Sequence, residues 1–172
     1  DHPSAPSGDG HIEAHVVVAD VLAPMSAANL EGTARATFTN ASVFGLAIEN
    51  AVVDAAASGG IVRVNALDVQ GSAAKVSAKG TVALIGEGQS DLSYLIDVAD
   101  LSMFQTLTPH TLGGSAHAEG RITGPAGQLK TAGTLSSNSL MAGPAKALAL
   151  KSKFDLAIPV NDLERTTGQM DL

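Results

Sequence analysis

Apolar and polar residues alternate with a period of two over most of the chain. In the stretch 74–84, Val76 and Val82 occupy even positions, whereas Lys75 and Lys79 occupy odd ones. Such alternation predicts β-strands that have one apolar and one polar face. Glycine, serine, asparagine and proline residues interrupt the pattern at short intervals, which indicates tight turns. The pattern predicts about nine or ten long strands, each paired antiparallel with its neighbours in the sequence.

One piece of this pattern occurs twice. The residues V-A-D at 18–20 recur at 98–100, and L-E-G-T-A at 30–34 is similar to L-G-G-S-A at 112–116. In both copies the valine of the V-A-D motif is the last of four alternating apolar residues. Repetition of this kind is typical of chains that are built by stacking one structural unit.

The repetition predicts how the chain is organised. Residues 1–9 are polar and rich in proline and glycine, which predicts a linker. Residues 10–89 are then a first β repeat and 90–172 a second, incomplete one, within one continuous curled sheet. We expect 160–172 to be a ragged polar edge. Because the chain starts without Met and without a signal-like stretch, we expect a fragment of a larger protein.

The alternation breaks at two equivalent places, 20–29 and 100–108, where apolar residues recur at helical spacing. An aspartate begins each segment and can cap a helix there. Both segments are too short to be stable helices without packing against the rest of the protein. The sequence therefore predicts one or two short helices, and the second of them, a junction helix, would present three apolar residues: Leu101, Phe104 and Leu107.

Two local features of the strand pattern can be tested against a structure. In the strand expected over 46–57, Leu46, Ile48 and Val52 share one register. In the next strand the apolar phase slips near Ala66, which predicts a β-bulge.

A sheet with one apolar face must hide that face from water. A sandwich of two sheets, a sheet closed on itself and an open sheet curled into a trough all achieve this. Long strands, many small alanines and glycines inside strands (Gly80, Gly120 and Gly133) favour the trough, because glycine lets a strand bend. The predicted fold is all-β: a long antiparallel meander curled into an open trough with an apolar concave face.

Composition narrows the possible functions. Aromatic residues make up 3% of the chain and Trp is absent, so the interior consists of small aliphatic side chains. The formal net charge of −7 argues against a nucleic-acid surface, which needs clustered Lys and Arg. The absence of Cys fits a bacterial cell-envelope protein. No apolar run is long enough to span a bilayer as a helix.

The chain offers no constellation for catalysis or metal binding. His11 and His15 share a strand face but lie four residues apart, about 13 Å, which is too far for one metal ion. His110 and His117 lack partner ligands in the sequence. The acidic residues near them fit a polar face and a helix cap better than an acid/base pair. We expect no enzymatic activity, no metal and no cofactor.

The segment 98–135 contains the most distinctive motifs. It reads V-A-D-L-S-M-F-Q-T-L and then L-G-G-S-A-H-A-E-G-R-I-T-G-P-A-G-Q-L-K-T-A-G-T-L. The pattern G-x-A-x-A-E-G-x-I-T-G-P-x-x-x-L-x-x-x-G spans 114–133, and A-K-V-S-A-K-G-T-V-A-L at 74–84 is similar to a further copy. On these motifs the chain resembles the AsmA/TamB-like envelope proteins, closest to the TamB type, over nearly all of 10–158.

This resemblance implies a β-taco, a sheet curled around an apolar groove, in a periplasmic protein anchored in the inner membrane of a diderm bacterium. Such proteins are linked to outer-membrane homeostasis and are thought to conduct phospholipids between the two membranes. TamB-type members pair with an outer-membrane barrel-assembly protein. The chain is thus expected to be the periplasmic segment of a bridge-like lipid transfer protein, with phospholipid or another amphiphile as its ligand.

Physical chemistry supports a lipid groove independently, since an acyl chain gains about 0.8 kcal/mol for each CH2 removed from water. The residues expected to line the groove are Val16, Val18, Phe38, Val76, Val82, Leu84, Tyr94, Ile96, Val98, Leu148, Leu150, Phe154, Leu156 and Ile158. Two alternatives remain. The chain is a protein-binding module that assists outer-membrane protein assembly by accepting a client strand at a sheet edge, or it is a purely structural β array.

Overall fold

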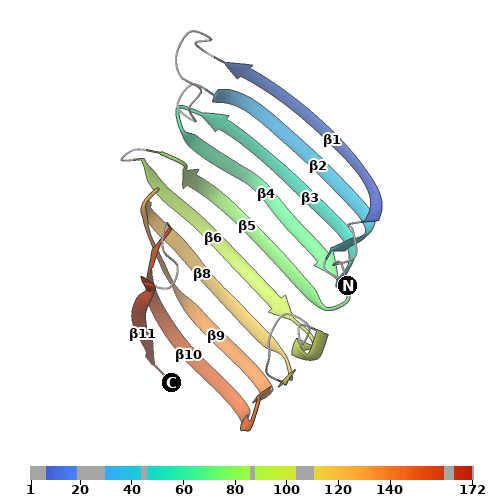
Figure 1. The fold of residues 1–172 in the computed structure, drawn as a ribbon, viewed down its shortest axis with the longest axis vertical. Helices are drawn as coiled ribbons and strands as arrows, with labels where there is room; N and C mark the ends of the chain where they lie inside the picture. The colour runs from blue at the N-terminus through green and yellow to red at the C-terminus, as the bar shows by residue number, and fades with distance from the viewer. Residues whose placement is uncertain are drawn as a thin grey trace.

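The computed structural model describes residues 7–18, 30–43, 46–85, 88–103, 111–160 and 165–171. These residues form a single open sheet of eleven strands, and the described parts contain no α-helix (Figure 1). The strands are β1 (Ser7–Val18), β2 (Leu30–Val43), β3 (Leu46–Ser58), β4 (Ile61–Gly71), β5 (Ala74–Ala83), β6 (Gln89–Val98), β7 (Leu112–Gly113), β8 (Ala116–Pro125), β9 (Gln128–Ala142), β10 (Ala145–Pro159) and β11 (Thr167–Asp171).

The sheet is an antiparallel meander in which spatial order follows chain order. The main path runs from β1 through β6 to β8 and on to β11, and the two-residue β7 pairs with β9 beside β8. β1 and β11 lie at opposite edges, so the sheet stays open. The strands bend along their length, which makes the sheet curled rather than flat (Figure 1). The predicted all-β open trough is confirmed.

The sheet is continuous across the expected border between the two repeats. β5 pairs with β6 from Ala74↔Val98 to Thr81↔Asp91, and β6 pairs with β8 in turn. Tight turns lie where glycine predicted them, for example at Gly59-Gly60, where both residues have positive φ (58° and 77°). Glycine adopts this backbone region more readily than other residues because it has no Cβ, which explains its use there.

The predicted bulge is confirmed, at Asn65-Ala66 in β4. Asp54 of β3 is opposite Ala66, whereas the next residue of β3 is opposite Val64, so one extra residue is accommodated in β4. The register between β4 and β5 shifts at the same place, between Val64 and Leu67. The extra residue returns Leu67 to the face that Val64 occupies, and the apolar face is continuous past the bulge.

One predicted detail is wrong: the strand β1 begins at Ser7, within the segment expected to be a linker. Within 160–172 a short strand, β11, forms by pairing with β10. Leu46, Ile48 and Val52 share one register with β2, as predicted. Val52 is opposite Thr37 and Asp68, so this register belongs to the polar face, and Ala51, Val53 and Ala55 lie on the apolar face of β3.

The described residues form a single layer with little fully buried interior. The buried apolar residues are Ala51, Ala73 and Ala83, and no large side chain is less than 2% exposed. Stability must therefore come mainly from the backbone ladder and from half-buried contacts between neighbouring side chains on one face. Such a sheet leaves its apolar face open.

Candidate functional site: an open apolar face

The register of the strands assembles a continuous apolar face across the sheet. One row of residues crosses the sheet from β1 to β11. Each residue of this row is directly opposite a residue of the neighbouring strand. With strands about 4.8 Å apart, the row is roughly 45 Å long. Its members are Ile12, Ala36, Val53, Leu67, Ala78, Tyr94, Gly120, Gly133, Phe154 and Met170.

The apolar face is the inner face of the curled sheet. In β4 the apolar Val62, Val64 and Val69 are half-buried, whereas Arg63 and Gln70 on the other face are exposed. No second layer covers the described sheet, so only neighbours on the same face can screen these valines. Side chains converge on the inner side of a curved sheet, which gives the apolar residues this partial cover.

Most residues predicted to line a groove share this face. By register they are Val16, Phe38, Val76, Val82, Tyr94, Ile96, Val98, Leu150, Phe154, Leu156 and Ile158. Leu84 follows the end of β5 and is 49% exposed. Leu148 has the same phase as Leu150 but is 91% exposed near the start of β10. The side chain of Val18 lies outside the described residues. The role of all these residues in binding stays a prediction.

Two glycines on the apolar face lie between two aromatic side chains. Gly120 of β8 and Gly133 of β9 are directly opposite each other. Tyr94 lies over Gly120, because a Cβ built there would be 2.6 Å from the Tyr94 hydroxyl oxygen. Phe154 lies over Gly133 in the same way, with its Cζ 2.8 Å from such a Cβ. The rings occupy the space that the missing side chains leave, and thus keep this part of the face apolar.

Buried polar groups on the apolar face are satisfied within the protein. The Tyr94 hydroxyl is 2.8 Å from Thr131 Oγ1. Ser90 Oγ accepts a hydrogen bond of 3.0 Å from the backbone N–H of Ala83. Ser137 Oγ donates one of 2.5 Å to a backbone carbonyl. Within the described residues, no buried side-chain nitrogen or oxygen lacks a partner. An apolar ligand on this face would therefore leave none of these buried hydroxyls unpaired.

The junction helix is described only in part. Residues 101–103 form a single 3₁₀ turn, and Phe104 and Leu107 lie outside the described residues. Asp100 caps the turn as expected, since its Oδ1 accepts a 2.8 Å hydrogen bond from the Ser102 N–H. The Leu101 N–H donates to the Gly114 carbonyl, which ties the turn to the start of the next strand.

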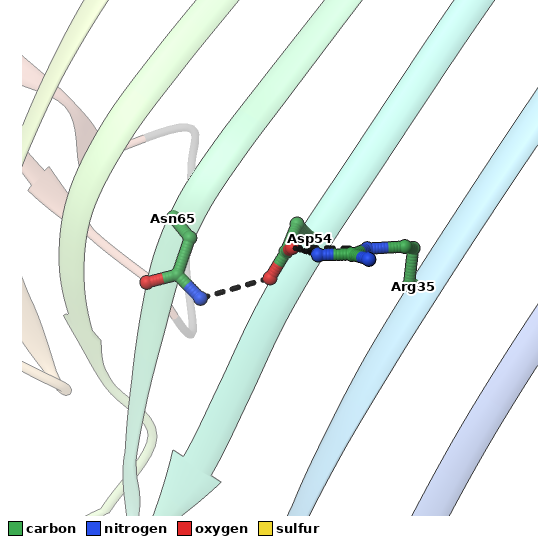
Figure 2. A network of polar contacts seen from close by, with 3 residues as sticks. All are labelled: Arg35, Asp54 and Asn65. Carbon is green, nitrogen blue, oxygen red and sulfur yellow. Dashed lines mark hydrogen bonds and ion pairs between the residues drawn. The ribbon is translucent and has the colours of Figure 1, made fainter.

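The opposite face of the sheet carries cross-strand charge pairs. Figure 2 shows one network on three neighbouring strands, formed by Arg35, Asp54 and Asn65. Arg35 Nη2 donates to Asp54 Oδ2 at 2.5 Å, and Asn65 Nδ2 donates to Asp54 Oδ1 at 2.8 Å. The bulge of β4 supplies Asn65 to this network. The hydrogen bonds from Asn65 and Arg35 lower the pKa of Asp54.

Two further pairs link β6 to β8 on the polar face. Arg121 donates to Asp91 through Nε and, at 2.5 Å, through Nη2. His117 Nδ1 is 2.5 Å from Asp97 Oδ1, and this hydrogen bond raises the pKa of His117 above its ordinary 6.5. These aspartates lie on the polar face, as predicted, and the structure pairs them with residues of the neighbouring strand.

The His117–Asp97 pair predicts a pH dependence of stability. Because the pKa of His117 is raised in the folded state, its contribution is complete below about pH 6.5 and is lost as pH rises through the folded pKa. We expect His117→Gln to lower the urea midpoint at about pH 5 and to change it little at about pH 9. In an Asp97→Asn background this difference between the two pH values should vanish. A His117→Gln effect that is equal at both pH values would contradict the assignment.

In the described residues, neither groups of metal-binding side chains nor surface depressions indicate a second site. Among the described residues, no three His, Cys, Asp or Glu side chains are grouped so that they could hold a metal ion. His110 lies outside these residues. Surface depressions lie among polar side chains, one beside Lys75, Asp97 and His117 and another beside Arg35. Residues of the apolar face, such as Val98 and Ser137, line part of the first depression.

Comparison of the chain with protein-family models, with curated proteins and with solved structures found no match. In the part of the chain that the structure describes, no helix is long and apolar enough to cross a bilayer.

Proposed function

We propose that this chain shelters the acyl chains of phospholipids on its apolar face. The observation that carries the proposal is the unbroken apolar row from β1 to β11, which no second layer covers in the described residues. Soluble proteins seldom expose a contiguous apolar surface of this length unless it contacts a partner. The role requires no catalytic group, and we propose that the protein is not an enzyme.

An open groove suits an amphiphile better than a closed cavity does. Each methylene that leaves water contributes about 0.8 kcal/mol, and small aliphatic side chains can contact acyl chains without a tailored pocket. A charged headgroup can stay in water at the open side, which avoids its large desolvation cost. The hydroxyls of Tyr94, Ser90 and Ser137 are paired within the protein and need no polar partner from the ligand.

The cellular setting of the proposal comes from the resemblance to the AsmA/TamB-like proteins. On that basis the chain is a periplasmic segment of a bridge-like lipid transfer protein between the inner and outer membranes of a diderm bacterium. A barrel-assembly protein of the outer membrane is its proposed protein partner.

Binding of lysophospholipids with chains of increasing length tests this function. Two extra methylenes contribute about 1.6 kcal/mol if fully buried, which is roughly a fifteenfold change in Kd. Because one side of the groove is open, we expect a smaller change, of about threefold or more for each pair. Titration of lauroyl, myristoyl and palmitoyl species below their critical micelle concentrations, followed by isothermal calorimetry, measures it.

The headgroup provides the control. Replacing phosphoglycerol by phosphocholine at constant chain length should change Kd much less than two methylenes do. A Kd that does not depend on chain length, or that depends mainly on the headgroup, would contradict an acyl groove. No binding at all would favour the purely structural array.

A further inference from the structure

The two edges of the sheet differ in how well they are protected. At one edge β11 has five residues. At the other edge β1 has twelve residues and pairs with β2 along almost its whole length, and no other strand of the described residues pairs with its outer side. Proteins usually blunt such edges with proline, lysine or an inward charge. β1 contains no proline, no lysine and no inward charge, and its register with β2 shifts only at its start, between Ser7 and Asp9. Its apolar Ile12 and Val16 are each 64% exposed.

The polar face of β1 carries acidic residues and histidines in alternation. Asp9, His11, Glu13 and His15 occupy successive odd positions, and all are exposed. Within one chain, His11 Nε2 is 3.1 Å from Glu13 Oε1, so an imidazole and a carboxylate already meet on this strand. Such an order of residues is self-complementary when the strand pairs antiparallel with a copy of itself.

We propose that β1 is the interface between two copies of this chain, paired antiparallel about a twofold axis at Ile12. In this register Ile12 faces itself, His11 faces Glu13 of the second copy, and Asp9 faces His15. The twofold axis generates each pair twice, so four imidazole–carboxylate pairs can form across the interface. Hydrogen-bonded side-chain pairs directly across two strands stabilise a sheet.

Other registers are less favourable. An axis at residue 11 places Asp9 opposite Glu13, and an axis at residue 13 places Glu13 opposite itself; like charges directly opposite are destabilising. An axis at Ala14 allows Glu13 to face His15 but leaves Asp9 without a partner in β1 and shortens the overlap. Pairing at Ile12 also joins the apolar faces of the two sheets, since Ala14 then faces Gly10. This inference does not depend on the proposed lipid ligand.

Engineered cysteines test both the interface and its register, because the chain has no cysteine of its own. In Ile12→Cys the two new thiols lie directly opposite each other, at a separation that suits a disulfide. In Ala14→Cys they lie four residues apart along the strands, about 13 Å, which is too far. We expect mild oxidation of Ile12→Cys to give a covalent dimer in several-fold excess over Ala14→Cys, and the unmodified chain to sediment as a dimer.

Each outcome decides the proposal. Efficient cross-linking of Ile12→Cys alone, together with a dimer in sedimentation equilibrium, supports it. Equal cross-linking of both variants indicates random collision and overturns it, as does a monomeric unmodified chain. Cross-linking of Ala14→Cys alone overturns the proposed register.

Discussion

Replacing Val82 or Leu150 by glutamate is expected to weaken acyl-chain binding by about tenfold or more, because a carboxylate on the apolar face would lose hydration when a lipid covers it. Val82 is opposite Val62 and Leu150 is opposite Ser137, so the two substitutions test the face at distant strands. Both side chains are half-buried, and the fold should survive. Titration with a myristoyl lysophospholipid measures the Kd, and circular dichroism checks the fold.

Ser93→Glu is the matched control for this pair of substitutions. It adds the same charge to the polar face, at an exposed position between Lys79 and Arg121 on the neighbouring strands. The new carboxylate should therefore be tolerated and leave the Kd unchanged. If Ser93→Glu weakened binding as much as Val82→Glu, net charge rather than the apolar face would account for the loss.

Replacing Gly133 by alanine is expected to have the largest effect on stability. A Cβ at this position would clash with the carbonyl oxygen of Glu119 and lie 2.8 Å from both Gly120 Cα and Phe154 Cζ. Two of these contacts involve backbone, which cannot move without breaking the ladder between β8 and β9. We expect a loss of about 2 kcal/mol or more in the free energy of unfolding, measured by urea denaturation.

Gly127→Ala, in the turn that follows β8, makes the same chemical change without the clash. Nothing lies within 4 Å of a Cβ built at Gly127. Its effect should be neutral or slightly stabilising, since alanine restricts the unfolded chain. Equal stability of the two variants would show that the close contact at Gly133 is not required for the fold.

The strand pattern predicted most of the fold because one face of each strand is consistently apolar. Val76 and Val82 in β5, and Leu92 and Ile96 in β6, have one unambiguous phase, and the register confirms that these residues share a face. The slip near Ala66 was visible because the alternation resumed in the opposite phase. Alternation predicts strands best in a single-layer sheet, because one face of each strand is half-buried and the other is exposed.

Alternation could not identify the inward face of a strand when both alternate sets of its residues are apolar, and it could not identify a strand when neither set is apolar. In β3 the adjacent Val52 and Val53 and several alanines fit either phase, and the pairing with β2 and β4 decides the face. The short β11 has no alternation of its own. It forms because Met170 and Gly168 lie against Phe154 and Leu156 of β10. Such tertiary pairing is not encoded in local sequence.

The candidate site was predictable as a face but not in its detail. The alternation identified Tyr94 and Phe154 as inward residues, yet their positions over Gly120 and Gly133 depend on a register across four strands. The sequence alone does not show that two glycines lie side by side between two aromatic residues of neighbouring strands. This arrangement becomes visible only when the order and register of the strands are known. The pairing of buried hydroxyls likewise depends on contacts between strands.

Site-specific photo-crosslinking at two adjacent residues of β6 tests the central claim most directly. A photoreactive amino acid at position 96 would lie on the apolar face, opposite Val76 and Ala118, whereas position 95 would lie on the polar face, opposite Ser77 and Glu119. After illumination with phosphatidylglycerol vesicles, mass spectrometry should detect lipid attached at position 96 and little at 95. Equal capture at both positions, or capture at 95 alone, would contradict an acyl groove on the apolar face.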